Sequence, residues 1–552
     1  MTVTSEGHLD AHGQISQPPL DSTKQKEAID IDVAHGAVVP SSADTYPYGL
    51  RLTLIVSSIM SCIFLIALDQ TILATAIPKI TDDFGGLNNV SWYGSAYFMT
   101  FGGFQPAWGK LYRFYYLKWT FLAAMFVFEV GSLICGIAPT SNLLIVGRAI
   151  AGIGGAGIIT GGYTIIAFSA SPQRRPVLTG LCGAVYGFAS VAGPLLGGVF
   201  TEQSTWRWCF YINLPIGGAA AVAIAVCFRQ PGTAKPEKAT FGEKMLQLDF
   251  VGIALAMGAI ICFIIGVEDG GKNHPWSSSV VIGLLVGFVL LLIALGFWEY
   301  YMGQRAMIIP SLLMRRSIGL GASFQFFYAG AYFLFLYYIP LYFQGVGGAS
   351  PVQSGVRNLP MVIAVSIAGL LGGFLVSRTG LGTPFMIVSS ALATVAAGLL
   401  YTWDVGTPSG KWIGYQILAG FAYAFCFQIT MNIAQATAEP QTMSSVTATI
   451  FFFQTLGSAF SISAAQAAFS NGIIRYIKAN APKIDTTKAI ETGATQIRDV
   501  FSADEVPVVV QAYMTGIQYA FALAIALTGV AFLISPLSSW RRLHGVTSAP
   551  YG

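Results

Sequence analysis

Charged residues are scarce in this chain. Asp, Glu, Lys and Arg together make up 10% of its 552 residues, whereas a soluble domain has about 25%. Hydrophobic residues make up 54%. This composition excludes a string of water-soluble domains. It indicates an all-α integral membrane protein, because each helix that crosses the hydrocarbon layer needs about 20 mostly apolar residues.

Histidine and paired cysteine are also scarce. The five histidines lie in the tails or in one polar loop, and the seven cysteines lie in or beside apolar runs without a CxxC pattern. A histidine proton relay or metal centre inside the membrane is therefore excluded, and neither a disulfide framework nor a metal site is expected. The net charge of +4 is too small and too dispersed for a nucleic-acid-binding face. We expect no cofactor.

Apolar segments of span length recur from Leu50 onward. They predict fourteen membrane-spanning helices at about residues 51–77, 90–109, 118–138, 142–169, 177–200, 209–228, 248–267, 279–300, 318–343, 355–376, 384–402, 411–432, 443–469 and 512–534. An even number of spans puts both termini on one side. Lys and Arg are more frequent in the short loops on the side of the tails, so we expect both termini in the cytoplasm.

The spans fall into two six-helix bundles with an inserted helix pair between them. The expected parts are a disordered cytoplasmic tail (1–49), the N-terminal bundle (50–228), a linker with the inserted pair (229–316), the C-terminal bundle (317–535), which includes a long extracellular loop (470–511), and a second cytoplasmic tail (536–552). The long loop has the composition of an amphipathic helix and is expected to cover the external face. Such doubling is typical of transporters whose substrate site lies between the two halves.

Three ionisable residues lie deep within predicted spans: Asp69, Glu129 and Arg148. Each costs about 3 kcal/mol in the middle of a membrane, so they must pair with one another or line a wet cavity. A buried carboxylate near an arginine can bind and release a proton as access alternates. We therefore predict that these residues couple transport to protons. A fixed ion pair that only sets helix register is the alternative.

Several motifs resemble a known family. Residues 68–78 (LDQTILATAIP) resemble the first-span signature of fourteen-span drug:proton antiporters of the major facilitator superfamily, and residues 147–152 (GRAIAG) resemble its fourth-span motif. The fifth span is similar to the antiporter motif, with Ala189 at a usual glycine position, and matches it at Gly180, Gly193, Pro194, Gly197 and Gly198. Pro194 kinks the helix, and the glycines permit close helix contact.

The loop after the second span resembles the superfamily's gating loop. Gly109 and Lys110 match it, and Arg113 stands where an acidic residue is expected. Residues 128–136, 206–217 and 357–360 are similar to fungal mycotoxin and multidrug efflux pumps. The resemblance covers about residues 50–535 and implies the major facilitator fold, proton-driven export, and transport rather than enzymatic activity.

The substrate site should lie near mid-membrane between the bundles. Its candidate lining residues are Gln70, Gln325, Tyr328, Tyr337, Gln428, Asn432 and Gln454. An apolar, aromatic cavity with few charges suits hydrophobic or amphipathic molecules better than sugars or phosphates. We expect the partners to be that small molecule, protons and the lipid bilayer, with the chain acting as a monomer.

Other interpretations stay open. A carrier of basic amino acids or siderophores, or a non-transporting sensor on the same fold, has a similar sequence pattern. The plasma membrane is the expected location, with a vacuolar or vesicular membrane as the alternative. Asn89 begins a glycosylation sequon on the predicted outer side.

Overall fold

The computed structural model describes residues 46–84, 90–540 and 542–543, and it forms helices and no β-strand within those ranges. Asn89, most of the predicted N-terminal tail (1–45) and nearly all of the C-terminal end (541 and 544–552) lie outside them. Serine and threonine start several long helices, since the side chains of Thr140, Ser278 and Ser350 each accept a hydrogen bond from the backbone N–H three residues on.

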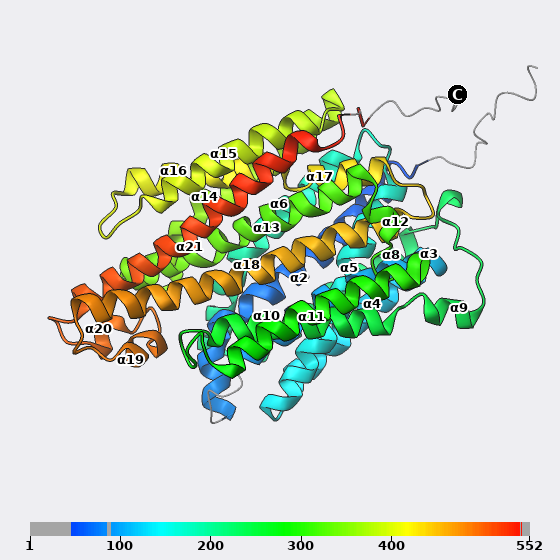
Figure 1. Cartoon of the computed structure of the whole chain (residues 1–552). Coiled ribbons are helices and arrows are strands. Elements are labelled where there is room, and N and C mark those ends of the chain that lie inside the picture. Colours follow the sequence, from blue (N-terminus) through cyan, green and yellow to red (C-terminus); the bar gives the residue numbers. More distant parts are fainter. Residues whose placement is uncertain (1–45, 85–89, 541, 544–552) are drawn as a thin grey trace, which may run out of the picture. The chain divides into compact units, whose positions relative to one another are not determined.

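The N-terminal bundle occupies the blue and cyan part of Figure 1. Its helices are α2 (Gly49–Phe84), α3 (Val90–Phe114), α4 (Leu117–Ile137), α5 (Ser141–Ser169), α6 (Arg175–Gln203), α7 (Trp208–Tyr211) and α8 (Asn213–Cys227). The sixth predicted span is thus interrupted at Ile212, between α7 and α8.

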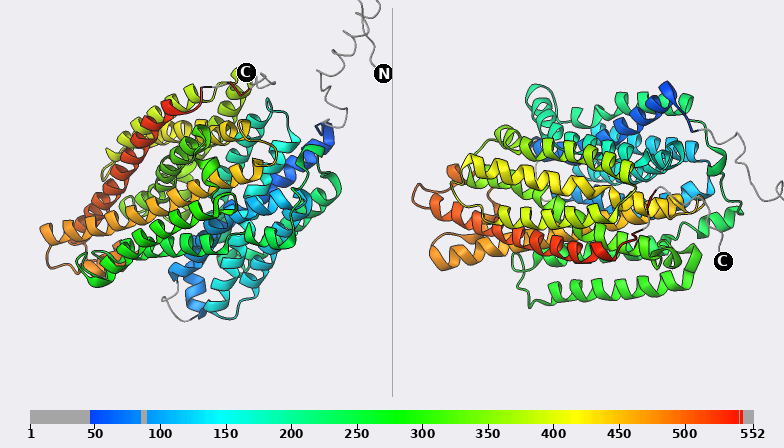
Figure 2. Two further views of the ribbon diagram at one scale, coloured as in Figure 1. Left: turned by 45° about the vertical axis from the view of Figure 1, so that its right-hand side comes forward. Right: turned by 90° about the horizontal axis from the view of Figure 1, so that it is seen from above.

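A linker and the inserted pair follow. Their elements are η1 (Gly232–Ala234), α9 (Phe241–Leu246), α10 (Phe250–Asp269), α11 (Ser279–Met302), η2 (Gly303–Arg305) and α12 (Pro310–Leu313). Helix α10 packs against α18 and α3, whereas α11 packs chiefly on α10 and lies on the outside, as the right-hand view of Figure 2 shows. Only 6% of the apolar window of α11 is buried, so this helix faces the surroundings on most of its surface.

The C-terminal bundle repeats the six-span plan. Its elements are α13 (Arg316–Leu341), the π-helical turn η3 (Tyr342–Val346), α14 (Pro351–Thr379), α15 (Thr383–Tyr401), α16 (Ser409–Phe427), α17 (Ile429–Ala436), α18 (Met443–Asn480), α19 (Thr486–Glu491), α20 (Ile497–Val500), α21 (Val506–Ile534) and η4 (Ser535–Leu537). Helix α18 continues beyond its predicted end at residue 469, because Ile473 and Ile477, four residues apart, extend the buried face of the helix.

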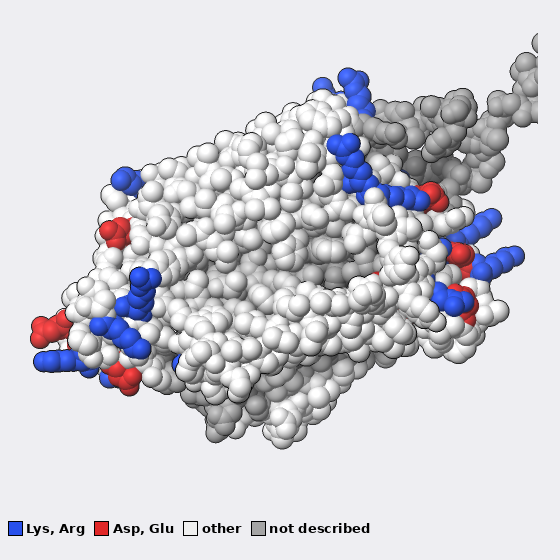
Figure 3. All heavy atoms as spheres, viewed as in Figure 1, with Lys and Arg blue, Asp and Glu red and all other residues white. Residues whose placement is uncertain are grey.

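Thirteen of the described helices are long and apolar enough to cross a membrane. The remaining predicted span, residues 90–109, also forms a helix, α3. It is less apolar because it lies between α5 and α18, where glycine and polar side chains meet protein rather than lipid. The fold prediction of two six-helix bundles with an inserted pair is confirmed. Figure 3 agrees with a membrane-embedded protein, since on the face shown the charged side chains gather at the two ends.

The two bundles meet chiefly along two helix pairs, α3 with α18 and α6 with α14. We call these contacts the seam. The end of the seam near the linker (residues 228–249) is the linker end, and the end near α19 and α20 is the far end; they lie at opposite sides of Figure 1. Helix α5 packs against α3 and α18, and α2 packs against α6, so both helices lie beside the seam.

Candidate proton-coupling site and bundle seam

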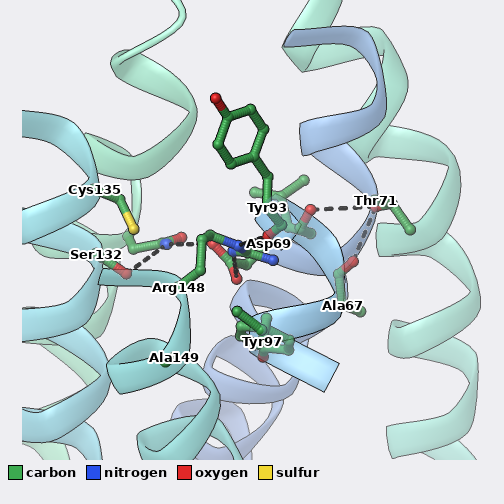
Figure 4. A network of polar contacts seen from close by, with 12 residues as sticks. Ala67, Asp69, Thr71, Tyr93, Tyr97, Ser132, Cys135, Arg148 and Ala149 are labelled. Carbon is green, nitrogen blue, oxygen red and sulfur yellow. Dashed lines mark hydrogen bonds and ion pairs between the residues drawn. The ribbon is translucent and has the colours of Figure 1, made fainter. Parts of the chain in front are cut away.

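A buried ion pair joins α2 to α5. Arg148 Nη1 lies 2.5 Å from Asp69 Oδ2, and the two side chains are 1% and 0% exposed. Figure 4 shows the two side chains meeting between the helices. Two of the three ionisable residues predicted from the sequence are therefore brought together. Each charge compensates the other, whereas either charge buried here without its partner would cost several kcal/mol.

Other groups hold the arginine in place. Arg148 Nε donates to the backbone oxygen of Tyr93 at 2.8 Å, and its guanidinium carbon lies 4.4 Å from the centre of the Tyr97 ring and 5.9 Å from that of Phe210. Aromatic faces favour a nearby cation. The guanidinium is thus fixed by α3 and α7 as well as by Asp69, so its position does not depend on the carboxylate alone.

Asn213 extends the network to α4. Its Nδ2 donates to Ser132 Oγ at 3.0 Å and reaches Asp69 Oδ1 at 3.5 Å. The helix interruption at Ile212 places Asn213 at the first position of α8, where its side chain enters the bundle. Neither Asn213 nor Ser132 was among the site residues predicted from the sequence. The sequence signal for Asn213 is an amide inside an apolar span, and the structure buries this side chain fully.

Glu129 lies outside this ion pair. It is one helical turn before Ser132 on α4, and its Oε1 would be only 1.7 Å from a Cβ placed on Gly217. Its buried Oε2 has no hydrogen-bond partner in the part of the chain that the structure describes. A carboxylate without a partner is costly to bury in the charged form. The third predicted residue is therefore close to the network through Ser132 but is not bonded to Asp69 or Arg148.

The antiporter-motif glycines make two different contacts. A Cβ on Gly193 would lie 2.1 Å from Thr71 Oγ1, and one on Gly197 would lie 2.2 Å from Thr75 Oγ1. These glycines thus bring α6 against the part of α2 that directly follows Asp69, and Pro194 lies inside α6 between them. Gly180 instead meets the other bundle, where a Cβ would be 2.4 Å from the backbone oxygen of Gly369. Gly198 has nothing within 4 Å.

The gating-loop residues close the linker end. A Cβ on Gly109 would lie 2.5 Å from Cβ of Ala448, and Ser444 Oγ donates to the Gly109 backbone oxygen at 2.9 Å. Lys110 Nζ donates to Gln247 Oε1 at 2.9 Å and to the Gln304 backbone oxygen at 2.7 Å. Helix α3 is therefore bound both to α18 and to the segments that flank the inserted pair.

Arg113 finds an acidic partner in the linker. Its Nε lies 2.5 Å from Glu237 Oε2, and its backbone oxygen accepts from the Glu237 N–H at 3.0 Å. Glu237 of the linker thus takes the place of the acidic residue that the gating loop lacks. Because it lies far from Arg113 in the sequence, residue spacing could not predict this contact.

Other ionisable residues are buried near the ends of spans. Lys110 is 1% exposed and Glu299, near the end of α11, is 7% exposed. Glu299 Oε2 accepts from the Ile308 N–H at 3.0 Å. Both residues lie near span ends, so their position along the chain suggested solvent. The folded chain after α11 covers them instead.

The seam is packed at the linker end and loose at the far end. On α3, Gly109 and Gln105 are buried, whereas Phe98, further along the same stripe, is 40% exposed. On α14, a Cβ on Gly373 would lie 2.3 Å from the Pro176 backbone oxygen, but one on Gly355 would meet nothing within 4 Å. Bundle contacts therefore weaken from the linker end towards the far end.

Some predicted cavity residues make contacts beside the seam. Asn432 Nδ2 donates to Thr179 Oγ1 at 3.0 Å across the two bundles. Tyr186 donates to Gln70 Oε1 at 2.5 Å. Gln428 lies at the break between α16 and α17, where its side chain is 3.6 Å from a Cβ position on Gly183.

The other cavity candidates lie in the C-terminal bundle. Gln325 Nε2 donates to Gln454 Oε1 at 3.0 Å, which links α13 to α18. Tyr328 is fully buried, and its hydroxyl contacts Ser389 and the Ala422 backbone oxygen, so it packs inside the bundle. Tyr337 is 55% exposed and lines a separate cavity of about 240 Å³ beside Glu268. The seven candidates therefore do not form one cluster.

Two helical bundles with a buried ion pair and a seam closed at one end define a membrane transporter. The chain matches the family model described as Major Facilitator Superfamily over residues 59–462. It is 57% identical over 530 residues to "MFS-type transporter grgE" of Penicillium sp, covering 96% of this chain and 92% of that protein. It is 52% identical over 514 residues to "Probable efflux pump gsfJ" of Penicillium aethiopicum, covering 93% and 92%.

The solved structures support the same fold. The human organic anion transporter MFSD10 (TETRAN) aligns with a TM-score of 0.58 at 14% sequence identity, covering 88% of this chain and 100% of that one. The chain therefore belongs to the Major Facilitator Superfamily, as the motif resemblance predicted.

Proposed function

We propose that this protein is a proton-coupled antiporter that exports hydrophobic or amphipathic small molecules, such as fungal secondary metabolites, toxins or drugs. The single observation that carries the proposal is the fully buried Asp69–Arg148 pair. The pair connects two helices of one bundle beside the seam, so a change in its charge alters the strength of the contact between those helices.

The coupling step follows from the contacts of Asp69. When Asp69 is ionised, it satisfies Arg148 and lies within reach of Asn213. Protonation removes the charge that compensates the guanidinium, which stays fixed by Tyr93 and Tyr97. The stability of the α2–α5 contact thus depends on the proton. Glu129, which is half-buried and whose buried Oε2 has no hydrogen-bond partner among the described residues, is the second proton-binding candidate.

The antiporter-motif contacts would carry this change to the seam. Gly193 and Gly197 hold α6 against α2 just after Asp69, and Gly180 on the same helix touches α14 of the other bundle. Helix α6 therefore connects the proton site to the bundle contact. If the linker end is cytoplasmic, as the Lys and Arg distribution predicts, the packed linker end corresponds to an outward-facing state.

The polar groups between the bundles indicate the nature of the substrate. The side chains that meet beside the seam are neutral: Gln70, Thr179, Tyr186, Gln428 and Asn432. Neutral polar groups among aromatic residues suit amphipathic compounds and offer no acidic group to a basic amino acid. A relative named as a probable efflux pump supports the export direction. We place the protein, as a monomer, in the plasma membrane.

The test is proton-driven transport in proteoliposomes. Wild type, Asp69→Asn and the exposed-site control Asp504→Asn are reconstituted at equal density, and uptake of rhodamine 6G and a panel of uncharged aromatic metabolites is followed with and without an acidic interior. Wild type and the control should accumulate at least one compound only with the pH gradient, and Asp69→Asn should not. Equal uptake by Asp69→Asn, uptake independent of the gradient, or no movement of any compound would refute the proposal.

A further inference from the structure

A cavity of about 640 Å³ lies at the linker end, away from the seam. It is bounded by the end of α3, the start of α4 and the linker, and its lining includes Tyr115, Tyr116, Lys235, Lys238 and Lys244. Nothing in the proposed transport step uses this cavity.

The cavity is positively charged. Lys235 and Lys238 are exposed, and Lys244 lies with its Nζ 4.2 Å from the centre of the Tyr115 ring. None of the three forms an ion pair with a residue that the structure describes. The one acidic lining residue, Glu237, is neutralised by Arg113 from outside the lining. Among the described residues, the three lysines around this cavity thus have no acidic partner.

The cavity also lies at the level where lipid head groups begin. Tyr116, Trp119 and Phe126 form one exposed stripe at helical spacing along α4, with 62%, 66% and 69% of their surface exposed. Such an apolar stripe on a spanning helix faces lipid, and tyrosine and tryptophan concentrate at the membrane interface. The stripe begins at Tyr116, which lines the cavity, so the cavity borders the lipid-facing surface.

The neighbouring helix α9 has the same character. Phe241 and Met245, one turn apart, are 73% and 37% exposed, while Lys244 between them points to the cavity lining. A short segment with exposed apolar side chains and a lysine beside them is suited to lie in the head-group layer.

We propose that this cavity binds the head group of an anionic phospholipid. The lipid phosphate would be held by Lys235, Lys238 and Lys244, and the acyl chains would follow the α4 stripe. Each lysine near an anionic membrane surface contributes to attraction, and apolar contact along the stripe adds specificity for a lipid over a soluble anion. Bound lipid would join the linker to α3 beside the Arg113–Glu237 contact. It would thereby stabilise the packed linker end. The inference does not depend on proton coupling.

The test is native mass spectrometry of the full chain released from detergent, titrated with phosphatidylglycerol or phosphatidylcholine. The variant K235A/K238A/K244A is compared with K411A/K478A/K483A, which removes three exposed lysines elsewhere. Wild type and the control should retain phosphatidylglycerol in preference to phosphatidylcholine. The first variant should bind phosphatidylglycerol about tenfold or more weakly, and K235R/K238R/K244R should retain binding.

Three results would overturn the proposal. Undiminished phosphatidylglycerol binding by K235A/K238A/K244A would mean that the lipid lies elsewhere. An equal loss in the control variant would mean that only net charge matters. Complete displacement of the lipid by inorganic phosphate would show a soluble-anion site instead of a lipid site.

Discussion

The Asp69–Arg148 pair allows a quantitative test of whether it serves structure or coupling. Removing one member leaves the other charged and buried, which costs about 3–5 kcal/mol of unfolding free energy. Asp69→Leu strands a guanidinium that is 1% exposed, and Arg148→Met strands a carboxylate that is 0% exposed. Each single variant should therefore be strongly destabilised.

The double variant should recover most of that loss. With both charges gone, Met at position 148 would lie among the rings of Tyr97 and Phe210, which accept a thioether well, and Asn213 keeps its bond to Ser132. Replacing a whole buried ion pair by apolar residues is often neutral. The free energy of unfolding of the double variant should thus lie within about 2 kcal/mol of that of wild type. This outcome corresponds to a coupling energy of several kcal/mol between the two sites.

The assay is thermal unfolding of the purified full chain in one detergent, read with a thiol-reactive dye. Buried cysteines such as Cys62 and Cys135 become reactive only when the bundle opens. The expected order of midpoints is wild type close to the double variant, and both well above the two single variants. If the double variant loses as much as the two single losses added together, the two residues do not act as a pair and the reasoning fails. A stable double variant that no longer couples transport to protons would separate the structural role from the coupling role.

Two further predictions use neighbouring contacts. Gly197→Ala should destabilise the α2–α6 contact by about 1–3 kcal/mol and reduce transport, because its Cβ would meet Thr75 Oγ1 at 2.2 Å. The control Gly198→Ala, whose Cβ would meet nothing within 4 Å, should match wild type in thermal midpoint and transport. Equal effects of the two substitutions would contradict the predicted contact. At the far end, the Trp206 indole, with help from Arg207, holds the pKa of the exposed Asp83 carboxyl below its ordinary value. A lowered pKa contributes stability that is lost as pH falls through the folded-state value, so Trp206→Phe should flatten the fall of the thermal midpoint below about pH 4, and an unchanged slope would contradict this effect.

The fold was predictable because its signal is local. Each span is a long apolar run, and the pattern of runs predicts the bundles before any tertiary contact is known. At the exceptions, tertiary contacts outweigh the local signal. Helix α3 is less apolar because it is enclosed by protein, and α18 runs on to Asn480 because buried isoleucines outweigh the polar residues between them.

The site was predictable only in part. Asp69 and Arg148 stand out because a charge inside an apolar run demands a partner. Their actual pairing, and the bond between Arg113 and Glu237, join residues 79 and 124 positions apart, and no spacing rule connects such positions. Asn213 was missed because a neutral amide costs less to bury than a charge, so it gives a weaker signal in the sequence.

The most direct test of the central claim is the number of protons released when substrate binds. Purified full chain in weakly buffered detergent is mixed with a compound that wild type transports, and the pH change is recorded for wild type, Asp69→Asn and Glu129→Gln. We predict that binding releases protons from wild type and none from Asp69→Asn, with Glu129→Gln showing whether the second carboxylate takes part. Proton release by Asp69→Asn equal to that of wild type would contradict the assignment of Asp69 as the coupling residue.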